Sequence, residues 1–276
     1  MIVLGVKRLK FAFNGATTMG ASLAEDIVCA KKAGFEMLEI WKSKLFDTIK
    51  SDGVEVVKEL FEQNALKPVT INSIEQATFS SREEKFKECE RLCELANTLN
   101  VEAIVVVPGF VRERLDEGTV VKESVEVLKQ MARIAGRFNV KLGFEFLGFP
   151  DCSVNTLVLA WKIVEQVGEN NVGLIIDTCH FFAGGSKLED LERIDASKIV
   201  IVHVNDLPKL EDVKDSDRLM PGDGILPLRD FFKTLKKIGY SGPVSVELFN
   251  ERYWQLSACE VAREAFEKLK VFVQKS

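Results

Sequence analysis

The chain alternates short apolar runs with longer amphipathic stretches along nearly its whole length, and this alternation limits the folds open to it. The apolar runs are rich in Val, Ile, Leu and Phe, as is typical of parallel strands covered on both faces. Eight such runs lie at residues 9–14, 35–40, 66–72, 103–108, 140–146, 172–177, 199–204 and 243–249. Stretches of helical period lie at 22–33, 52–64, 82–100, 120–138, 154–168, 188–193, 227–238 and 257–274.

Eight strand–helix units predict an α/β fold, a single (β/α)8 TIM barrel that spans residues 1–276 as one domain. The length agrees, because α/β barrels of about 250 residues commonly form one domain. The main alternative, a doubly wound sheet, fits eight evenly spaced units less well, and no G-x-G-x-x-G follows the first strand. Residues suited to begin or end helices stand at the expected places: Ser22, Ser81, Ser257, Gly34 and Gly239.

Charge and composition exclude several classes of partner. A net charge of -5 and a pI near 5.4 argue against nucleic acid or an anionic membrane, which are held by clustered Lys and Arg. No apolar run reaches the length of a membrane span, and residues 1–10 lack the apolar core of a signal peptide. The six cysteines are dispersed, and Cys89 and Cys93 are expected to be buried packing residues. We therefore expect a cytoplasmic protein.

A carboxylate or an imidazole stands at the end of each of the last four apolar runs. These residues are Glu145, Asp177, His203 and Glu247. Charges at the tips of apolar strands carry a desolvation cost unless they share a cation or face solvent. In a barrel the carboxyl ends of the strands converge on one mouth, so four adjacent strands would supply four ligands. Three carboxylates and one imidazole suit a single Mn²⁺, Co²⁺ or Mg²⁺ ion, and Zn²⁺ is compatible.

Two further residues are expected at the same mouth. His180 follows the sixth strand in Asp177-Thr178-Cys179-His180, in the predicted loop, and His180 and His203 are the only histidines of the chain. Arg218 stands in a turn-rich loop after the seventh strand, where its planar fork can bind a hydroxyl, carboxylate or phosphate. Cys179 lies beside Asp177 and is expected to be a small wall residue.

This set of residues resembles the xylose isomerase-like superfamily of sugar isomerases and epimerases. The matching motifs are Glu145, Asp177-x-x-His180, His203, Arg218-x-x-Pro-Gly-x-Gly and Ser245-Val246-Glu247-Leu248. Within the superfamily the chain is most similar to 2-keto-myo-inositol isomerases, and the similarity covers nearly all of it from Leu9 onward. The strings that carry this closer match are Phe13-Asn14-Gly15-Ala16-Thr17-Thr18, Pro150-Asp151-Cys152-Ser153-Val154-Asn155-Thr156 and Val246-Glu247-Leu248-Phe249 with Tyr253.

The resemblance implies a divalent-metal-dependent isomerase of a keto-cyclitol or ketose. Glu145, Asp177, His203 and Glu247 would bind one ion. Glu145 and Glu247 would also be the catalytic residues, moving protons through a metal-bound enediolate. His180 and Arg218 would bind substrate oxygens. Related barrels often form dimers, so a homodimer is compatible.

Departures from the pattern leave other functions open. Some inositol-pathway relatives carry histidine where this chain has Phe149 and Phe182, a change that alters which hydroxyls are recognised. A ketose 3-epimerase of the tagatose or psicose type and an inosose dehydratase share the same ligands and remain alternatives. A non-catalytic carbohydrate-binding barrel is a third. The superfamily's endonuclease IV needs a histidine-rich cluster of three zinc ions, which two histidines do not supply.

Overall fold

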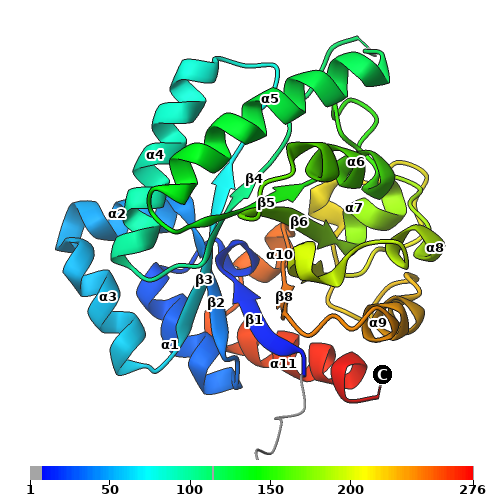
Figure 1. Ribbon diagram of the computed structural model, residues 1–276. Helices are drawn as coiled ribbons and strands as arrows, with labels where there is room; N and C mark the ends of the chain where they lie inside the picture. Colours follow the sequence, from blue (N-terminus) through cyan, green and yellow to red (C-terminus); the bar gives the residue numbers. More distant parts are fainter. Residues whose placement is uncertain (1–7, 114, 276) are drawn as a thin grey trace, which may run out of the picture.

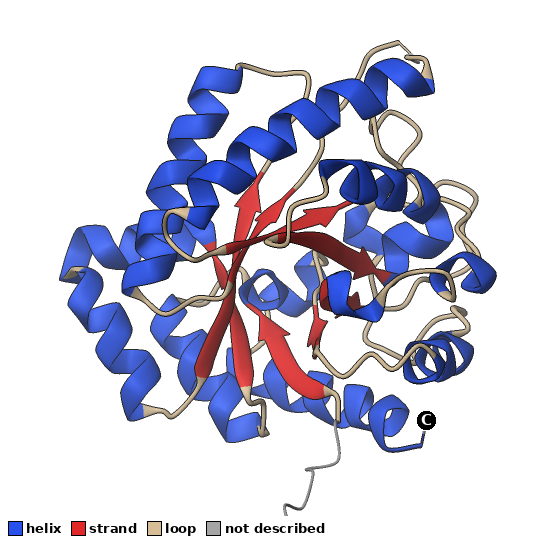
Figure 2. Ribbon diagram, viewed as in Figure 1, coloured by secondary structure: helices blue, strands red, loops and turns tan. Residues whose placement is uncertain are grey.

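The computed structural model describes residues 8–113 and 115–275. Within them eight parallel strands close into a barrel in which each strand pairs with the next and β8 pairs with β1 (Figure 2). The strands are β1 Lys10–Asn14, β2 Met37–Trp41, β3 Lys67–Ile74, β4 Ala103–Val106, β5 Lys141–Glu145, β6 Val172–Asp177, β7 Ile199–Val204 and β8 Pro243–Val246. The predicted TIM barrel is confirmed.

Helices surround the strands on the outside of the barrel (Figure 1). They are α1 Leu23–Ala33, α2 Lys42–Asp52, α3 Val54–Gln63, α4 Arg82–Thr98, α5 Glu117–Gly136, α6 Leu157–Val167, α7 Thr178–Ala183, α8 Leu188–Leu191, α9 Leu228–Lys237, α10 Glu251–Trp254 and α11 Ala258–Lys275. The predicted start of α1 is confirmed, because Ser22 forms a capping box with Glu25. Its end is confirmed too, since Gly34 has a φ of 110°.

The helix expected at 52–64 is confirmed as α3, but three other helical segments, α2, α7 and α10, were not predicted. Gly53, with a φ of 90°, separates α2 from α3. Only Lys44 and Leu45 of α2 are buried, so its apolar stripe is short. The loop predicted after β6 is helix α7, whose first turn is capped by Asp177. The short helix α10 was also missed.

The side chains inside the barrel form a small apolar layer beneath its mouth. This interior cluster contains Ala12, Met37, Val69, Val105, Val107, Ile175 and Ile201, and it is separate from the larger core between strands and helices. Because side chains alternate along a strand, the residue two positions further toward the mouth also points inward. In four strands this next inward-facing residue is polar. It is Asn14 in β1, Glu39 in β2, Asp177 in β6 and His203 in β7.

One disulfide joins the first and last helices of the barrel. Cys29 on α1 and Cys259 on α11 are bonded with Cα atoms 4.5 Å apart, although 230 positions separate them. Figure 1 shows α11 running along the barrel beside α1, and the two helices are in contact. The other cysteines in the described part of the chain, Cys89, Cys93, Cys152 and Cys179, are free and buried, and the predicted burial of the Cys89 and Cys93 pair is confirmed.

Reduction of this disulfide is expected to lower the free energy of unfolding by about 2 to 4 kcal/mol, because the bond restricts a very long loop of the unfolded chain. Urea unfolding with and without a thiol reductant measures the effect. The double variant Cys29→Ser, Cys259→Ser is the control and should not respond to reductant. Equal midpoints for oxidised and reduced wild-type protein would contradict the expectation.

Residues 8–113 and 115–275 contain no helix that combines the length and the apolar character needed to cross a bilayer. The prediction that no signal peptide is present concerns mainly residues 1–7. Those residues lie outside the described part of the chain.

Candidate metal centre

The four residues predicted as metal ligands meet at the mouth of the barrel. Glu145 ends β5, Asp177 ends β6, His203 lies in β7, and Glu247 directly follows β8. Strand pairing aligns them, since Asp177 is the register partner of His203 and His203 is the partner of Ser245, two residues before Glu247. One ligand atom of each lies within 4.8 Å of the others, and all four side chains are buried.

His203 lies between carboxylates on both sides of its ring. Its Nδ1 is 2.9 Å from Glu145 Oε1 and 3.2 Å from Glu247 Oε2. Its Nε2 is 3.1 Å from Oε2 of Glu39. Burial alone would lower the pKa of His203, but the neighbouring carboxylates, led by Glu247, outweigh it and raise the pKa well above its ordinary value.

Glu247 is held by donors on both of its oxygens. Oε1 accepts hydrogen bonds from the Nδ2 atoms of Asn14 at 2.9 Å and Asn72 at 2.8 Å. Oε2 accepts one from Arg218 Nη1 at 2.7 Å. Burial opposes ionisation of Glu247, yet the charges of His203 and Arg218 prevail and lower its pKa to about 2. The carboxylate is thus fixed in position and ionised.

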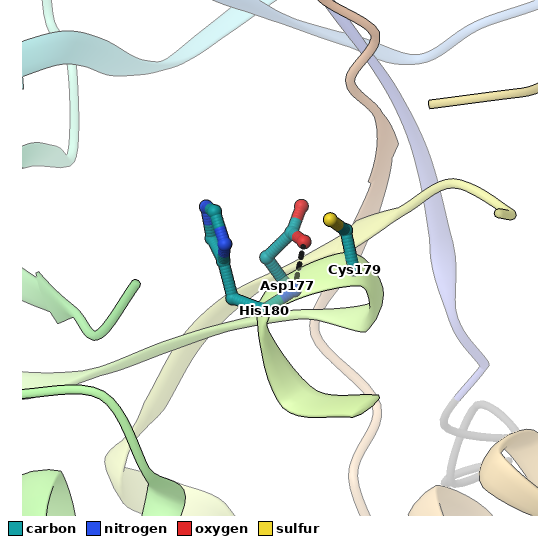
Figure 3. A group of neighbouring side chains, drawn as sticks. All are labelled: Asp177, Cys179 and His180. Atoms are coloured by element: carbon teal, nitrogen blue, oxygen red, sulfur yellow. Dashed lines mark hydrogen bonds between the residues drawn. The ribbon is translucent and has the colours of Figure 1, made fainter. Parts of the chain in front are cut away.

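Asp177 links β6 to helix α7. Its Oδ1 accepts the backbone N–H of His180 at 3.0 Å, and its Oδ2 accepts from Asn205 Nδ2 at 2.7 Å and from Arg218 Nη1 at 3.0 Å. Figure 3 shows the side chains of Asp177 and His180 rising side by side, with Cys179 on the other side of Asp177. Burial raises the pKa of the Cys179 thiol. Asp177, Cys179 and His180 also form a second group whose ligand atoms lie within 4.8 Å of one another.

His180 and Arg218, the residues predicted to bind substrate, contact each other beside the four ligands. Arg218 Nη2 lies 2.9 Å from His180 Nε2 and 2.6 Å from Asp215 Oδ1. Because a guanidinium only donates, Nε2 of His180 must accept, which leaves the proton of the neutral ring on Nδ1. Burial lowers the pKa of His180 to about 3, consistent with a neutral ring. Among the described residues none partners its Nδ1.

The charge balance of the site fits a divalent cation. Glu39, Glu145, Asp177 and Glu247 are four buried acidic side chains within one hydrogen-bonded cluster, whereas Arg218 is its only permanent cation among the residues described. Burial raises the pKa of Glu145 to about 7, with Glu247 and Asp177 adding to the effect and His203 opposing it. A dication with carboxylate and imidazole ligands would relieve this excess of negative charge.

A cavity of about 320 Å³ opens beside the cluster, is lined by two of the four predicted ligands, Glu145 and Glu247, and is large enough for one small ring. Glu145, His180, Arg218 and Glu247 contribute to its wall. The rest of its lining is Trp41, Asn72, Ser73, Glu75, Gln76, Val107, Phe110, Leu147, Asp215 and Phe249. A larger cavity of about 740 Å³ lies beside it and shares Phe110 and Asp215, but none of the four ligands lines that one.

Phe149 and Phe182 have different surroundings. Phe149 packs edge-on against the ring of His180, with centroids 5.0 Å apart, and so touches the site through a predicted substrate-binding residue. Phe182 packs against Phe181 and Phe231 instead. Both line the larger cavity, not the one lined by Glu145 and Glu247.

Comparison with known proteins places the chain in a family. A family model described as xylose isomerase-like TIM barrel matches residues 28–272. The chain belongs to this family. The inosose isomerase of Halalkalibacterium halodurans is 37% identical over 93% of this chain and 94% of its own length. The inosose isomerase of Bacillus subtilis is 35% identical over 93% of this chain and 95% of its own.

A solved structure agrees with these relatives. It is the crystal structure of an IolI protein with a bound zinc atom, 34% identical, with a TM-score of 0.94. The match covers 97% of this chain and 99% of that one. That structure holds zinc, and the buried cluster of Glu145, Asp177, His203 and Glu247 in this chain is consistent with one divalent metal.

Sequence reasoning missed several polar residues of the site. Glu39 is an acidic residue within the apolar run Met37-Leu38-Glu39-Ile40. The same pattern predicts the four ligands, so it could have predicted Glu39 as well. Asn14 was noticed only as part of a matching string. Asn72 and Asn205 carry no charge to mark them, and their role follows from their contacts with Glu247 and Asp177.

Metal affinity is expected to rise with pH through neutrality. The ion needs Glu145 as a carboxylate, and because its pKa in the metal-free protein is about 7, protons compete with the ion below about pH 7. His203 must also give up a proton, whereas Glu247 is already ionised. Competition with a chromophoric chelator should show affinity falling by up to about a hundredfold per pH unit below neutrality, because Glu145 and His203 each lose one proton when the ion binds. Glu145→Gln should bind more weakly and with a shallower pH dependence. Equal affinities at about pH 6 and pH 8 would contradict this expectation.

Proposed function

We propose that this protein is a divalent-metal-dependent isomerase of a keto-inositol, in which Glu145 and Glu247 transfer protons. The observation that carries the proposal is the convergence of four buried candidate ligands, two of which, Glu145 and Glu247, line a cavity of about 320 Å³. The full-length similarity to inosose isomerases supports the substrate class.

The four ligand residues would hold the ion. Glu145, Asp177 and Glu247 offer carboxylate oxygens, and His203 offers Nδ1, the ring nitrogen that faces Glu145 and Glu247. When bound, the ion supplies Lewis-acid stabilisation of the negative charge that develops on substrate oxygens. Asn14, Asn72 and Asn205 would keep the carboxylates oriented toward it through the hydrogen bonds described above.

The chemistry assigned to the two glutamates is a proton transfer between neighbouring carbons. One carboxylate removes the proton from the hydroxyl-bearing carbon next to the ketone, and the electron pair left behind forms an enediolate. The other carboxyl group, which takes up a proton from solvent, delivers it to the former carbonyl carbon, and the first gives its proton back to solvent. The hydroxyl proton passes from one oxygen to the other. The product is the isomeric hydroxy ketone, so atoms and electrons balance.

His180 and Arg218 are proposed to bind the substrate. The Nδ1 proton of His180 has no partner among the residues described, and His180 lines the cavity, so a substrate oxygen is a suitable acceptor. Arg218 holds Asp177 and Glu247 through Nη1, and its Nε has no partner within the described chain. Arg218 therefore orients two ligands as well as facing the cavity.

A substrate panel separates this proposal from its alternatives. Metal-loaded protein is incubated with keto-inositols and with free ketoses, and the products are identified by NMR. We expect conversion of a keto-inositol into its isomeric ketone. Epimerisation of a free ketose in preference would replace the proposal with a ketose 3-epimerase, and loss of water would replace it with a dehydratase. Turnover of no compound would favour a carbohydrate-binding barrel.

The cellular setting is part of the proposal. We infer a cytoplasmic enzyme, with support from the four free cysteines found in the described part of the chain, since reducing compartments keep thiols free. In that compartment the Cys29–Cys259 pair would be reduced. Fractionation of cells followed by alkylation of free thiols tests both points.

A further inference from the structure

Glu39 is a buried carboxylate that the proposed chemistry does not use. It lies on β2, which β1 separates from β8, and it is fully buried. It does not belong to the group whose ligand atoms lie within 4.8 Å of one another. A buried carboxylate that binds neither ion nor substrate costs stability unless it is fully hydrogen-bonded.

Each oxygen of Glu39 has defined partners. Oε2 accepts from Thr70 Oγ1 at 2.6 Å and lies 3.1 Å from His203 Nε2. Oε1 accepts from Asn14 Nδ2 at 3.0 Å. The orientation of the Asn14 amide is fixed as well, because its Oδ1 accepts the backbone N–H of Ala16 at 2.9 Å. Carboxylate oxygens accept only, so Nε2 of His203 must be the donor.

We propose that Glu39 is a positioning residue for the metal centre: it accepts a hydrogen bond from the Nε2–H of His203 and so leaves Nδ1 as the nitrogen that binds the ion. Metal-binding histidines commonly donate their second N–H to a carboxylate, which fixes the tautomer and the ring plane. Here Nδ1 already faces Glu145 and Glu247, so the assignment matches the direction of the other ligands. The inference rests on the proposed metal centre.

Asn14 extends the same role to a second ligand. Its Nδ2 donates to Glu39 Oε1 and also to Glu247 Oε1, at 3.0 Å and 2.9 Å. One amide therefore connects the carboxylate behind His203 with the carboxylate of Glu247. Displacement of Glu39 would disturb two of the four ligands, one through the imidazole and one through the amide.

The chain's two histidines make the test direct. Full-length protein labelled with ¹⁵N-histidine is loaded with zinc alone, and long-range ¹H–¹⁵N correlation reports which nitrogen of each ring carries a proton; His180→Gln assigns the signals. We expect His203 with a protonated Nε2 and a zinc-bound Nδ1. Zinc bound through Nε2, or a proton on Nδ1, would overturn the inference. No effect of zinc on His203 would overturn the metal centre itself, and this inference with it.

Two variants test the energetic consequence. Glu39→Gln keeps the shape, but its amide must turn a donor toward either Asn14 or His203, so zinc affinity should fall by about 10- to 100-fold. Thr70→Val is the matched control, since it removes the other donor to Oε2 and keeps the carboxylate; its affinity should stay near wild type. Circular dichroism of the metal-free proteins confirms that each is folded. Equal affinities of wild type and Glu39→Gln would contradict the role, and the NMR result on wild-type protein decides even if a variant fails to fold.

Discussion

Glu247→Gln is expected to abolish measurable isomerisation of the keto-inositol substrate. A positioned acid–base group contributes about 10²- to 10⁴-fold to the rate, and the variant also weakens a proposed metal ligand. Glutamine has no satisfactory orientation here. Its NH₂ group would face either the two amide donors of Asn14 and Asn72 or the guanidinium of Arg218. The measurement is kcat at saturating substrate and metal.

A matched substitution separates a loss of proton transfer from a general effect of replacing glutamate by glutamine. Glu59→Gln makes the same change on an exposed position of α3, away from the mouth of the barrel, and should leave kcat unchanged. Circular dichroism and bound metal are measured for both variants. A Glu247→Gln protein that is folded and turns over at the wild-type rate would exclude Glu247 as a proton carrier.

Removal of the metal is expected to have the second large effect. A Lewis-acid ion supplies several kcal/mol of stabilisation to the developing charge, so chelator-treated protein should lose on the order of 10³-fold in turnover. Without the ion, the carboxyl groups of Glu145, Asp177 and Glu247 also lie close together without the cation that would balance them. The melting temperature should therefore fall on chelation and recover when a divalent ion is added back.

The same experiment also identifies which ion supports activity best. Mn²⁺, Co²⁺, Mg²⁺ and Zn²⁺ are returned separately to chelated protein, and turnover and melting temperature are compared. Asp177→Asn is the control. Because it removes the charge of one proposed ligand, each added ion should restore less of the turnover and of the melting temperature. Full activity in protein shown to be metal-free by elemental analysis would contradict the metal-dependent mechanism.

Much of the fold and the centre of the site could be predicted from sequence for a simple geometric reason. Strands buried on both faces are visible as apolar runs, and the inward-facing residue at the end of such a run lies at the mouth of the barrel. Asp177 and His203 were found in this way, each two residues beyond an apolar residue of the barrel interior. Glu39 follows Met37 by the same spacing and was within reach of the same argument.

Other features depend on long-range closure, which the local pattern does not show. Cys29 and Cys259 are bonded because β1 pairs with β8 and brings α1 against α11, a contact between opposite ends of the chain. Helix α2 has few buried residues, and its weak periodicity hid it. The roles of Asn72 and Asn205 follow from hydrogen bonds to residues far away in sequence, and an amide gives no sign of such partners beforehand.

Exchange of substrate hydrogen with solvent tests the central claim most directly. Metal-loaded wild-type protein is incubated with a keto-inositol in deuterium oxide, and the substrate and product are examined by NMR. Proton transfer by Glu145 and Glu247 predicts that deuterium enters at the carbon next to the carbonyl, and that Glu247→Gln abolishes this exchange in a folded protein. Exchange that survives the substitution would contradict the account.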